Sequence, residues 1–245
     1  MNNSRFASGT FNLSNRAIGP ATFELLESQG LVKTLAEPTL MAVEQGHKLF
    51  IEKFGRGQRD YILMGMNPGP WGMAQTGIPF GEVNFSRDWL KVEAPVGKPN
   101  PEHPKRPVTG FSSPRSEVSG ARIWSWAKDR FGTPEHFFEK FYIINYCPLS
   151  FMEEGGRNRT PDKLPPNERK ALFAACDDAL QKMIRELKPK MVIGVGAFAE
   201  TQARRTLDGF NIDIGRILHP SPASPVANRG WAAAADAQFA ALGVL

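Results

Sequence analysis

Three polar side chains stand where short apolar runs of the sequence end. Asn67, Asn145 and His219 each close or follow a run with the length and composition of a buried strand. Because the carboxyl ends of parallel strands meet at one edge of a sheet, we expect the three side chains to lie close together. Amides and a neutral imidazole can each donate and accept hydrogen bonds. Together these three side chains indicate a binding site for a small polar ligand. The alternative is that each of them is an ordinary hydrogen-bonded residue at the end of a strand.

The stretch Met64–Val83 begins at the end of the apolar run Tyr61–Met64 and contains three prolines and five glycines. Proline removes backbone donors and glycine adopts dihedrals that other residues avoid, so regular structure is excluded. Open α/β sheets bind their ligands at such loops. Trp71 and Phe80 add flat apolar faces. The composition therefore favours a binding loop over a purely structural strand-to-helix connection.

A competing motif occurs later in the chain. Gly194–Ala199 fits the dinucleotide fingerprint Gly-x-Gly-x-x-Gly/Ala between a predicted strand and a predicted helix, and Asp213 follows 19 residues beyond Gly194. An acidic residue near that distance binds the ribose in dinucleotide-binding folds. An oxidoreductase that binds a dinucleotide is therefore the alternative function, and a tight strand–helix turn is the simpler explanation.

The apolar pattern alternates strands with helices, which predicts an α/β fold: a three-layer α/β/α sandwich around a four-stranded parallel sheet. Residues 1–18 are predicted to be a flexible arm and residues 19–245 a single domain. Trp124 and Trp126 fall on the apolar stripe of a helix, which indicates the core. The predicted strands are Tyr61–Met64, Phe141–Asn145, Met191–Val195 and Ile212–Leu218, and the predicted helices are Ala21–Leu31, Thr39–Phe54, Asn84–Leu90, Ser119–Phe131, Asn167–Leu187, one ending near Leu207 and one starting at Ser224.

Composition limits the class of protein. The chain has 245 residues, a net charge of +5 and two cysteines, Cys147 and Cys176. Two cysteines cannot supply the four ligands of an iron–sulfur cluster, and the four histidines lack metal-ligand spacing, so we expect no metal. No apolar run is long enough to span a membrane, and we see no secretory signal. The positive charge is compatible with a polyanionic partner.

Two segments are basic and rich in loop-forming residues. Pro95–Pro107 carries too many prolines for a helix or a central strand, and it is either an inert loop or a DNA contact. Gly155–Lys163 is glycine-rich and lies near the predicted carboxyl edge of the sheet. Its polar groups can meet phosphates, or the loop is simply solvated.

The sequence also resembles a known family. Met64–Val83 is similar to the first motif of the single-strand-selective monofunctional uracil-DNA glycosylases, and His219–Pro222 is similar to the second motif of their superfamily. Arg115–Arg122 and Asn145–Leu149 also match, and the resemblance runs in the family's order from about Pro20 to Trp231. It implies a metal-free, cofactor-free hydrolase of base-excision repair.

The resemblance implies a role for each site residue. Asn67 and His219 are expected to be catalytic: Asn67 would hold the attacking water and His219 would donate a hydrogen bond to the uracil O2. The family's strictly uracil-specific relatives carry Tyr where this chain has Gly69, so activity on 5-hydroxymethyluracil is expected. The expected base-binding residues are Met66 and Met73 through their backbones, Gly69, Phe80 as a stacking face, and Asn145 as the reader of N3–H and O4.

The resemblance further implies single- and double-stranded DNA containing uracil or oxidised thymine derivatives as the partner of a monomer. The expected location is the bacterial cytoplasm with the nucleoid, or the nucleus of a eukaryote. Ala223 departs from the bulky Arg or Leu of related enzymes, which puts activity on duplex DNA in doubt. The expected DNA contacts are Arg157, Asn158, Arg159, Lys163, Ser221, Pro222, Ala223, Ser224 and Arg229.

Overall fold

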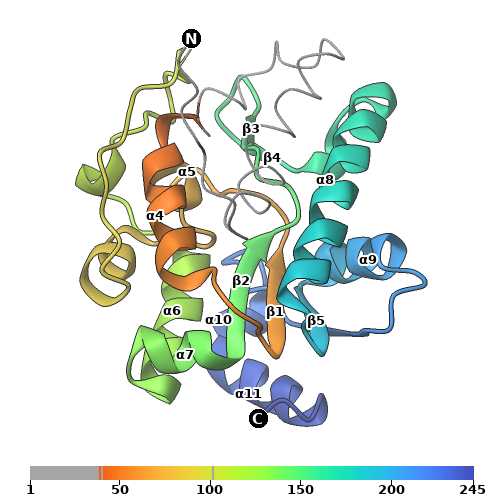
Figure 1. The fold of residues 1–245 in the computed structure, drawn as a ribbon. Coiled ribbons are helices and arrows are strands. Elements are labelled where there is room, and N and C mark those ends of the chain that lie inside the picture. The colour runs from red at the N-terminus through yellow and green to blue at the C-terminus, as the bar shows by residue number, and fades with distance from the viewer. Residues whose placement is uncertain (1–38, 40, 101) are drawn as a thin grey trace, which may run out of the picture.

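The computed structural model of the protein describes residues 39, 41–100 and 102–245 (Figure 1). The predicted arm, residues 1–18, and the predicted helix Ala21–Leu31 lie outside these residues. Helix α4, Glu44–Phe54, covers most of the segment predicted as Thr39–Phe54.

The centre of the fold is a four-stranded sheet whose strands all run parallel, in the order β2–β1–β5–β6. Gly65 pairs with Asn145, and Val195 pairs with Ile217, so the strands end together at one edge. The predicted parallel sheet is confirmed to within a residue or two at each end. The strands are β1 (Tyr61–Gly65), β2 (Phe141–Asn145), β5 (Met191–Val195) and β6 (Asp213–Ile217).

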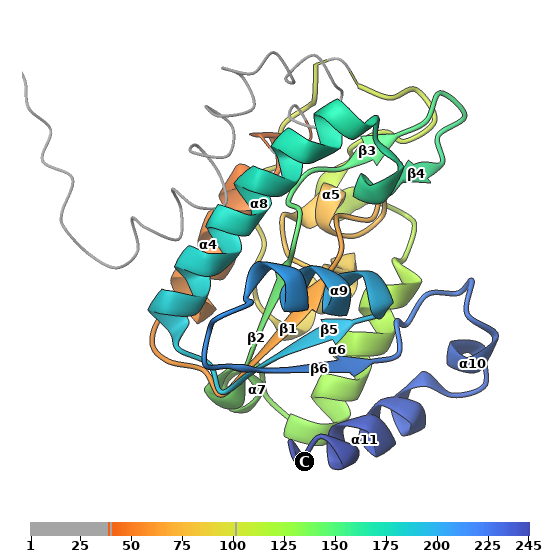
Figure 2. The same cartoon turned by 90° about the vertical axis from the view of Figure 1, so that its right-hand side faces the viewer.

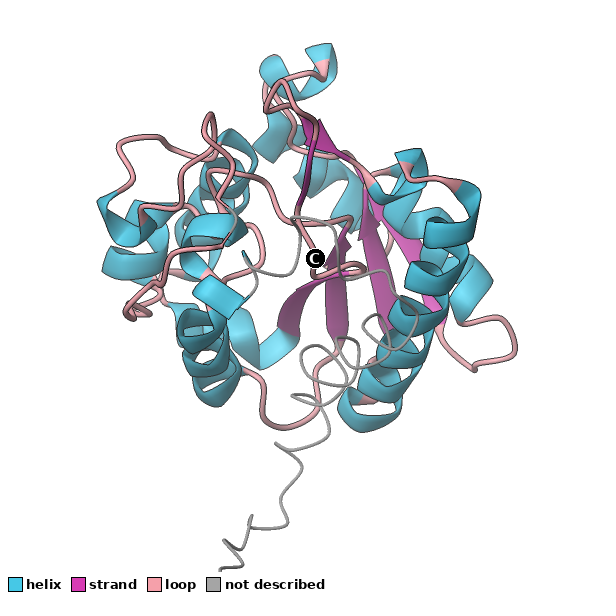
Figure 3. Cartoon of the chain, turned by 90° about the horizontal axis from the view of Figure 1, so that it is seen from above, coloured by secondary structure: helices cyan, strands magenta, loops and turns pink. Residues whose placement is uncertain are grey.

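Helices lie on both sides of this sheet, as the view from above shows (Figure 3). Helices α8 (Pro166–Leu187) and α9 (Ala197–Thr206) pack together, and α9 lies against β5 and β6. Helices α6 (Val118–Phe131), α7 (Pro134–Lys140) and α11 (Trp231–Ala241) form the other layer. The predicted three-layer α/β/α sandwich is therefore confirmed.

Aromatic side chains fill the space between the sheet and helices α6, α7 and α11. Trp126 stacks on Phe239 with ring centroids 4.9 Å apart, and Phe137 stacks on Phe141 at 5.3 Å. Trp124 is completely buried beside Phe137. The tryptophans of α6 are thus core residues, as their spacing predicted, and they are not free to stack on a ligand.

Several short elements differ from the prediction. Helix α7 was missed, although Thr133 at its N-cap and Pro134 in its first turn are ordinary start signals. A two-stranded hairpin, β3 (Phe151–Met152) with β4 (Asn158–Arg159), was also missed because each strand is only two residues long. The remaining short segments are α5 (Met73–Thr76), a π-helical turn η2 (Phe85–Trp89) where a short helix was predicted, and the 3-10 turns η3 (Gly110–Ser112) and η4 (Pro161–Lys163).

The last predicted helix is two helices in the structure (Figure 2). Helix α10, Pro225–Asn228, starts at the predicted N-cap Ser224, whose hydroxyl accepts a hydrogen bond from the Ala227 N–H. Gly230 then adopts a φ of 140°, outside the helical range, and α11 starts at Trp231. The chain is therefore interrupted at Gly230, between α10 and α11.

The glycine turn after β5 packs the strand against α9. A Cβ on Gly194 would overlap the backbone nitrogen of Glu200, and Gly196 lies against His219. Asp213 pairs with Met191 at the beginning of the strands, so it lies at the opposite edge of the sheet from the turn. The dinucleotide hypothesis is therefore rejected, because the predicted ribose-binding acid is on the wrong edge.

This packing yields a stability prediction. Gly194→Ala should lower the free energy of unfolding by about 2 kcal/mol, since overpacking against fixed backbone costs roughly 1–3 kcal/mol. The expected fall in Tm is about 4–8 °C for a chain of this size, measured by calorimetry. Gly155→Ala is the matched control because nothing lies within 4 Å of its Cβ. Equal Tm values for both variants would contradict the prediction.

Candidate active site

A cavity of about 270 Å³ opens at the carboxyl edge of the sheet. The structure brings together there all seven residues predicted to be catalytic or base-binding, together with three of the predicted DNA contacts and four residues that the sequence did not single out. The lining residues are Met66, Asn67, Gly69, Pro70, Met73, Phe80, Glu117, Ser119, Asn145, Asn158, Thr160, His219, Ser221 and Pro222.

Asn145 and Phe80 meet over Gly65, the last residue of β1. A Cβ on Gly65 would overlap both the Asn145 amide oxygen and the Phe80 ring. The Asn145 Nδ2 atom donates to the Met73 sulfur at 3.2 Å. Met73 therefore acts on the site through its side chain, whereas only its backbone was expected to contribute.

Phe80 has an unusual backbone conformation for a bulky residue, with a φ of 54°. Its carbonyl oxygen accepts a hydrogen bond of 3.0 Å from the indole N–H of the buried Trp124. Its ring centroid lies 6.1 Å from that of His219. Non-glycine residues are held in this region only where surrounding contacts enforce it, and such positions concentrate at functional sites.

Asn67 follows β1 and lines the cavity beside Met66. Its Nδ2 atom donates to the Leu149 carbonyl at 3.4 Å. This bond orients the amide and leaves its oxygen as an acceptor. An amide oxygen can hold a water molecule, but it cannot take up a proton at neutral pH.

His219 follows β6, and its ring faces the same cavity. The Ser221 N–H donates to Nδ1 at 3.1 Å, so a neutral ring carries its hydrogen on Nε2. Burial lowers the pKa of His219 to about 4, so the ring is neutral near pH 7. The arrangement supplies a neutral N–H donor.

Two residues with no predicted role fix the segment that carries His219. The Trp231 indole N–H donates to the Leu218 carbonyl at 2.7 Å, and Arg122 donates to the Pro220 carbonyl at 3.0 Å. Arg122 also donates to the Asn228 side-chain oxygen at 2.9 Å. Arg122 lies inside one of the matching motifs, but only the tertiary structure shows what it touches.

In the part of the chain that the structure describes, Glu117 is the one acidic side chain that lines the cavity. It occupies the residue before helix α6. Burial raises the pKa of its carboxyl group, while the N–H groups of Ser119 and Trp71 and the Ser119 hydroxyl oppose the rise. Glu117 lies inside Arg115–Arg122, one of the matching motifs, but no spacing rule connects it with Asn67 or His219. Only the tertiary structure shows that it lines the cavity.

Some of the predicted DNA contacts line the cavity, and the others lie outside it. Asn158 lines the cavity itself, and its buried Oδ1 has no hydrogen-bond partner among the described residues. Arg157 is exposed and pairs with Glu153 at 2.9 Å, and Arg159 donates to the Lys163 carbonyl at 2.9 Å. Ser221 and Pro222 line the cavity, Ser224 caps α10, and Ala223 and Arg229 are exposed.

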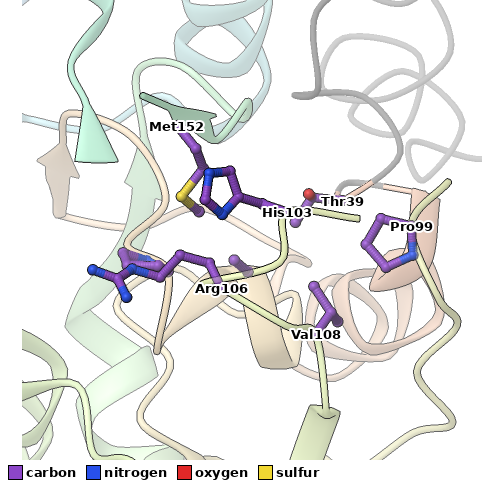
Figure 4. Close-up of a pocket in the computed structure, with 8 residues that line it drawn as sticks. Thr39, Pro99, His103, Arg106, Val108 and Met152 are labelled. Carbon is purple, nitrogen blue, oxygen red and sulfur yellow. The ribbon is translucent and has the colours of Figure 1, made fainter. Parts of the chain in front are cut away.

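A second, much smaller hollow lies beside the proline-rich segment 95–107 (Figure 4). It is lined by Pro99, His103, Arg106 and Met152, among others, and its volume of about 10 Å³ is near that needed for one water molecule. His103 approaches the Glu153 carbonyl at 3.1 Å, which ties the loop to the β3–β4 hairpin. We therefore place the chemistry in the larger cavity.

Within the described part of the chain, no three His, Cys, Asp or Glu side chains are arranged to hold a metal ion. Both cysteines are free and buried. Among residues 39, 41–100 and 102–245, no helix is both long and apolar enough to cross a membrane.

Comparison with known proteins agrees with this geometry. Residues 52–240 match the uracil DNA glycosylase superfamily. This chain belongs to that superfamily. The predicted family, and with it the predicted enzyme class of uracil-DNA glycosylase, is confirmed.

Similar family members come from mammals. The single-strand selective monofunctional uracil DNA glycosylase of Mus musculus is 47% identical over 201 residues, which cover 81% of this chain and 72% of the mouse protein. The Bos taurus protein of the same name is 44% identical over 222 residues, covering 90% and 81%. Among solved structures, Pedobacter heparinus SMUG2 superposes with a TM-score of 0.61 over 80% of each chain at 20% identity, which supports the fold.

The burial of His219 yields a spectroscopic prediction. In ¹H–¹⁵N spectra of the histidine side chains, the ring should stay neutral with its hydrogen on Nε2 and should protonate only as the pH approaches about 4. Because the folded pKa lies below the unfolded value of about 6.5, the unfolded chain binds the proton first, and folding stability falls as the pH drops between these values. A ring that titrates near pH 6.5, or one with its hydrogen on Nδ1, would contradict this assignment.

Proposed function

We propose that this protein is a monofunctional DNA glycosylase that hydrolyses the N-glycosidic bond of uracil, and of 5-hydroxymethyluracil, in base-excision repair. The observation that carries the proposal is the convergence of Asn67, Asn145 and His219 on one cavity beside the Phe80 ring. Each group matches one requirement of the reaction. The base must be bound outside the stack, its leaving charge must be stabilised, and a water must reach the sugar.

Asn145 and Phe80 recognise the base in this proposal. One amide accepts from uracil N3–H and donates to O4, while Phe80 stacks on the flipped ring. Cytosine presents the opposite pattern of donors and acceptors, so it would leave buried polar groups unpaired. The Met73 contact and the Gly65 close approach support a fixed Asn145 amide.

His219 and Asn67 carry the chemistry. The neutral His219 donates through Nε2 to the uracil O2, where negative charge develops as the bond breaks. Because Asn67 cannot act as a base, the glycosidic bond breaks before the water attacks in this proposal. An oxocarbenium-like sugar forms, and the water held by Asn67 then adds to it. Met64–Val83 contains no lysine that could form a Schiff base with the sugar, so the product is an abasic site in an uncut strand.

The DNA would lie across the carboxyl edge of the sheet, along the β3–β4 hairpin and the segment from Ser221 to Arg229. Arg157 and Arg229 are exposed, and in this proposal they would meet phosphates. Ala223 is a small exposed side chain at the position where related enzymes carry a wedge, which favours single-stranded over duplex DNA. We further propose that the protein acts as a monomer where the cell's DNA is, in the nucleoid-containing cytoplasm or the nucleus.

The decisive experiment is base release from a single-stranded oligonucleotide with one uracil, followed by alkali. The wild type should give strand cleavage only after alkali. Asn67→Ala and His219→Ala should each lose on the order of a hundredfold or more in rate, since removal of one such stabilising group commonly costs that much. Asn211→Ala and His136→Ala, at exposed positions, are the matched controls. No release of uracil or 5-hydroxymethyluracil by the wild type would refute the proposal.

A second experiment tests the DNA-binding edge. Arg229→Ala should weaken binding to all sequences alike and should reduce the slope of log Kd against log salt concentration by about 1, the contribution of one phosphate contact. Fluorescence anisotropy with an uncleavable single strand measures this. Lys182→Ala, on α8 and paired with Asp178, is the control that should leave the slope unchanged. A slope unchanged by Arg229→Ala would remove this residue from the DNA-binding surface.

A further inference from the structure

Two arginine side chains contact one tryptophan beside the cavity. The guanidinium carbon of Arg115 lies 4.7 Å from the centre of the Trp71 ring, and that of Arg106 lies 5.2 Å from it. Trp71 follows Pro70, which lines the cavity. Three stretches of the chain therefore meet at this ring: the glycine-rich loop, the proline-rich segment 95–107 and the residues before helix α6.

The structure around this ring holds Trp71 and Arg106 in place. The Trp71 N–H faces the Glu117 carboxylate and favours its charged form. Arg106 lies between the ring and the β3–β4 hairpin, since a Cβ on Gly156 would come within 3.5 Å of its guanidinium carbon. A guanidinium group that packs on an aromatic ring still has N–H donors in its own plane for a ligand. These donors are therefore oriented before any ligand binds.

Neither guanidinium group forms an ion pair with a described residue. The Arg106 Nε atom is also buried without a hydrogen-bond partner there. Two positive charges held against one ring repel each other, so an anion that binds both would stabilise the arrangement. The arginines that do form ion pairs in the described chain are Arg87, Arg130, Arg157, Arg204, Arg205 and Arg216.

A nucleic-acid backbone is the anion that suits this position. Pro70 lines both the cavity and the small hollow beside Arg106, so one residue separates the two (Figure 4). A strand whose base enters the cavity carries phosphates on both sides of that base, and these must cross the protein surface close to the opening. The planar fork of arginine binds phosphate through two parallel hydrogen bonds.

We propose that Arg106 and Arg115, held by Trp71, bind phosphates of nucleotides that flank the flipped base, so that the DNA strand passes across Trp71 on one side of the cavity. The inference rests on the proposed function. It adds to the DNA-binding edge a surface that is built from other segments than the β3–β4 hairpin and Ser221–Arg229. The two arginines contact the strand and do not touch the base.

The first test measures how binding depends on salt. Fluorescence anisotropy with an uncleavable uracil-containing single strand gives the slope of log Kd against log salt concentration. Arg106→Ala and Arg115→Ala should each reduce this slope by about 0.7, and the double variant by about 1.4, because each phosphate contact on a single strand contributes about 0.7. The double lysine variant keeps both charges and should keep most of the slope.

The matched control removes two positive charges elsewhere. Arg130→Ala/Arg204→Ala changes the net charge by the same amount, at arginines that pair with Asp236 and Glu200. Its slope should equal that of the wild type. A double variant of Arg106 and Arg115 whose slope equals that of this control would overturn the proposal. The single variants give the answer if the double variant does not fold.

The second test separates strand binding from damage to the site. In single-turnover base release with saturating enzyme, Arg106→Ala/Arg115→Ala should stay within about twofold of the wild type, since all substrate is then bound. With enzyme far below Kd, its rate should fall by the same factor as its affinity. Equal losses under both conditions would overturn the proposal, because the arginines would then act on the site itself. A wild type that binds the strand but releases no uracil would instead refute the proposed function, and the salt slopes would still test the arginines.

Discussion

The site depends on the parallel pairing of β1 with β2 and β5. In-register hydrogen bonding places Gly65 beside Asn145 and makes all four strands end at one edge. The residues just beyond those ends then share one cavity although they are up to about 150 positions apart in the chain. A slip of one residue in β2 would turn the Asn145 side chain to the other face of the sheet, because side chains alternate along a strand.

Hydrogen bonds from buried aromatic residues to backbone carbonyls hold the site in shape. Trp124 fixes Phe80 in its left-handed conformation, and Trp231 holds the carbonyl of Leu218, the residue before His219. Both indoles belong to the same aromatic core, in which Trp126 contacts both Trp231 and Phe239. The core thereby positions the functional groups before any ligand arrives, which is the arrangement that electrostatic stabilisation of a leaving group requires.

The polar side chains that follow the strand ends carry no charge. Asn67 and Asn145 are uncharged amides, and burial keeps His219 neutral. Among the described residues, Glu117 is the one carboxylate that lines the cavity. In the proposed mechanism, uncharged groups around the base do not repel the negative charge that develops on it as it departs.

The sequence by itself determined the fold class, the four strands and the residues at their ends, because alternating apolar runs and dense glycine and proline are local signals. It also identified the motifs that place this chain in its family. Only the tertiary structure showed that Glu117 lines the cavity and which groups Arg122 and Trp124 contact, and it rejected the dinucleotide turn by placing Asp213 at the opposite edge. These residues act through contacts between segments distant in sequence, and such contacts leave no periodicity or spacing that the chain alone could reveal.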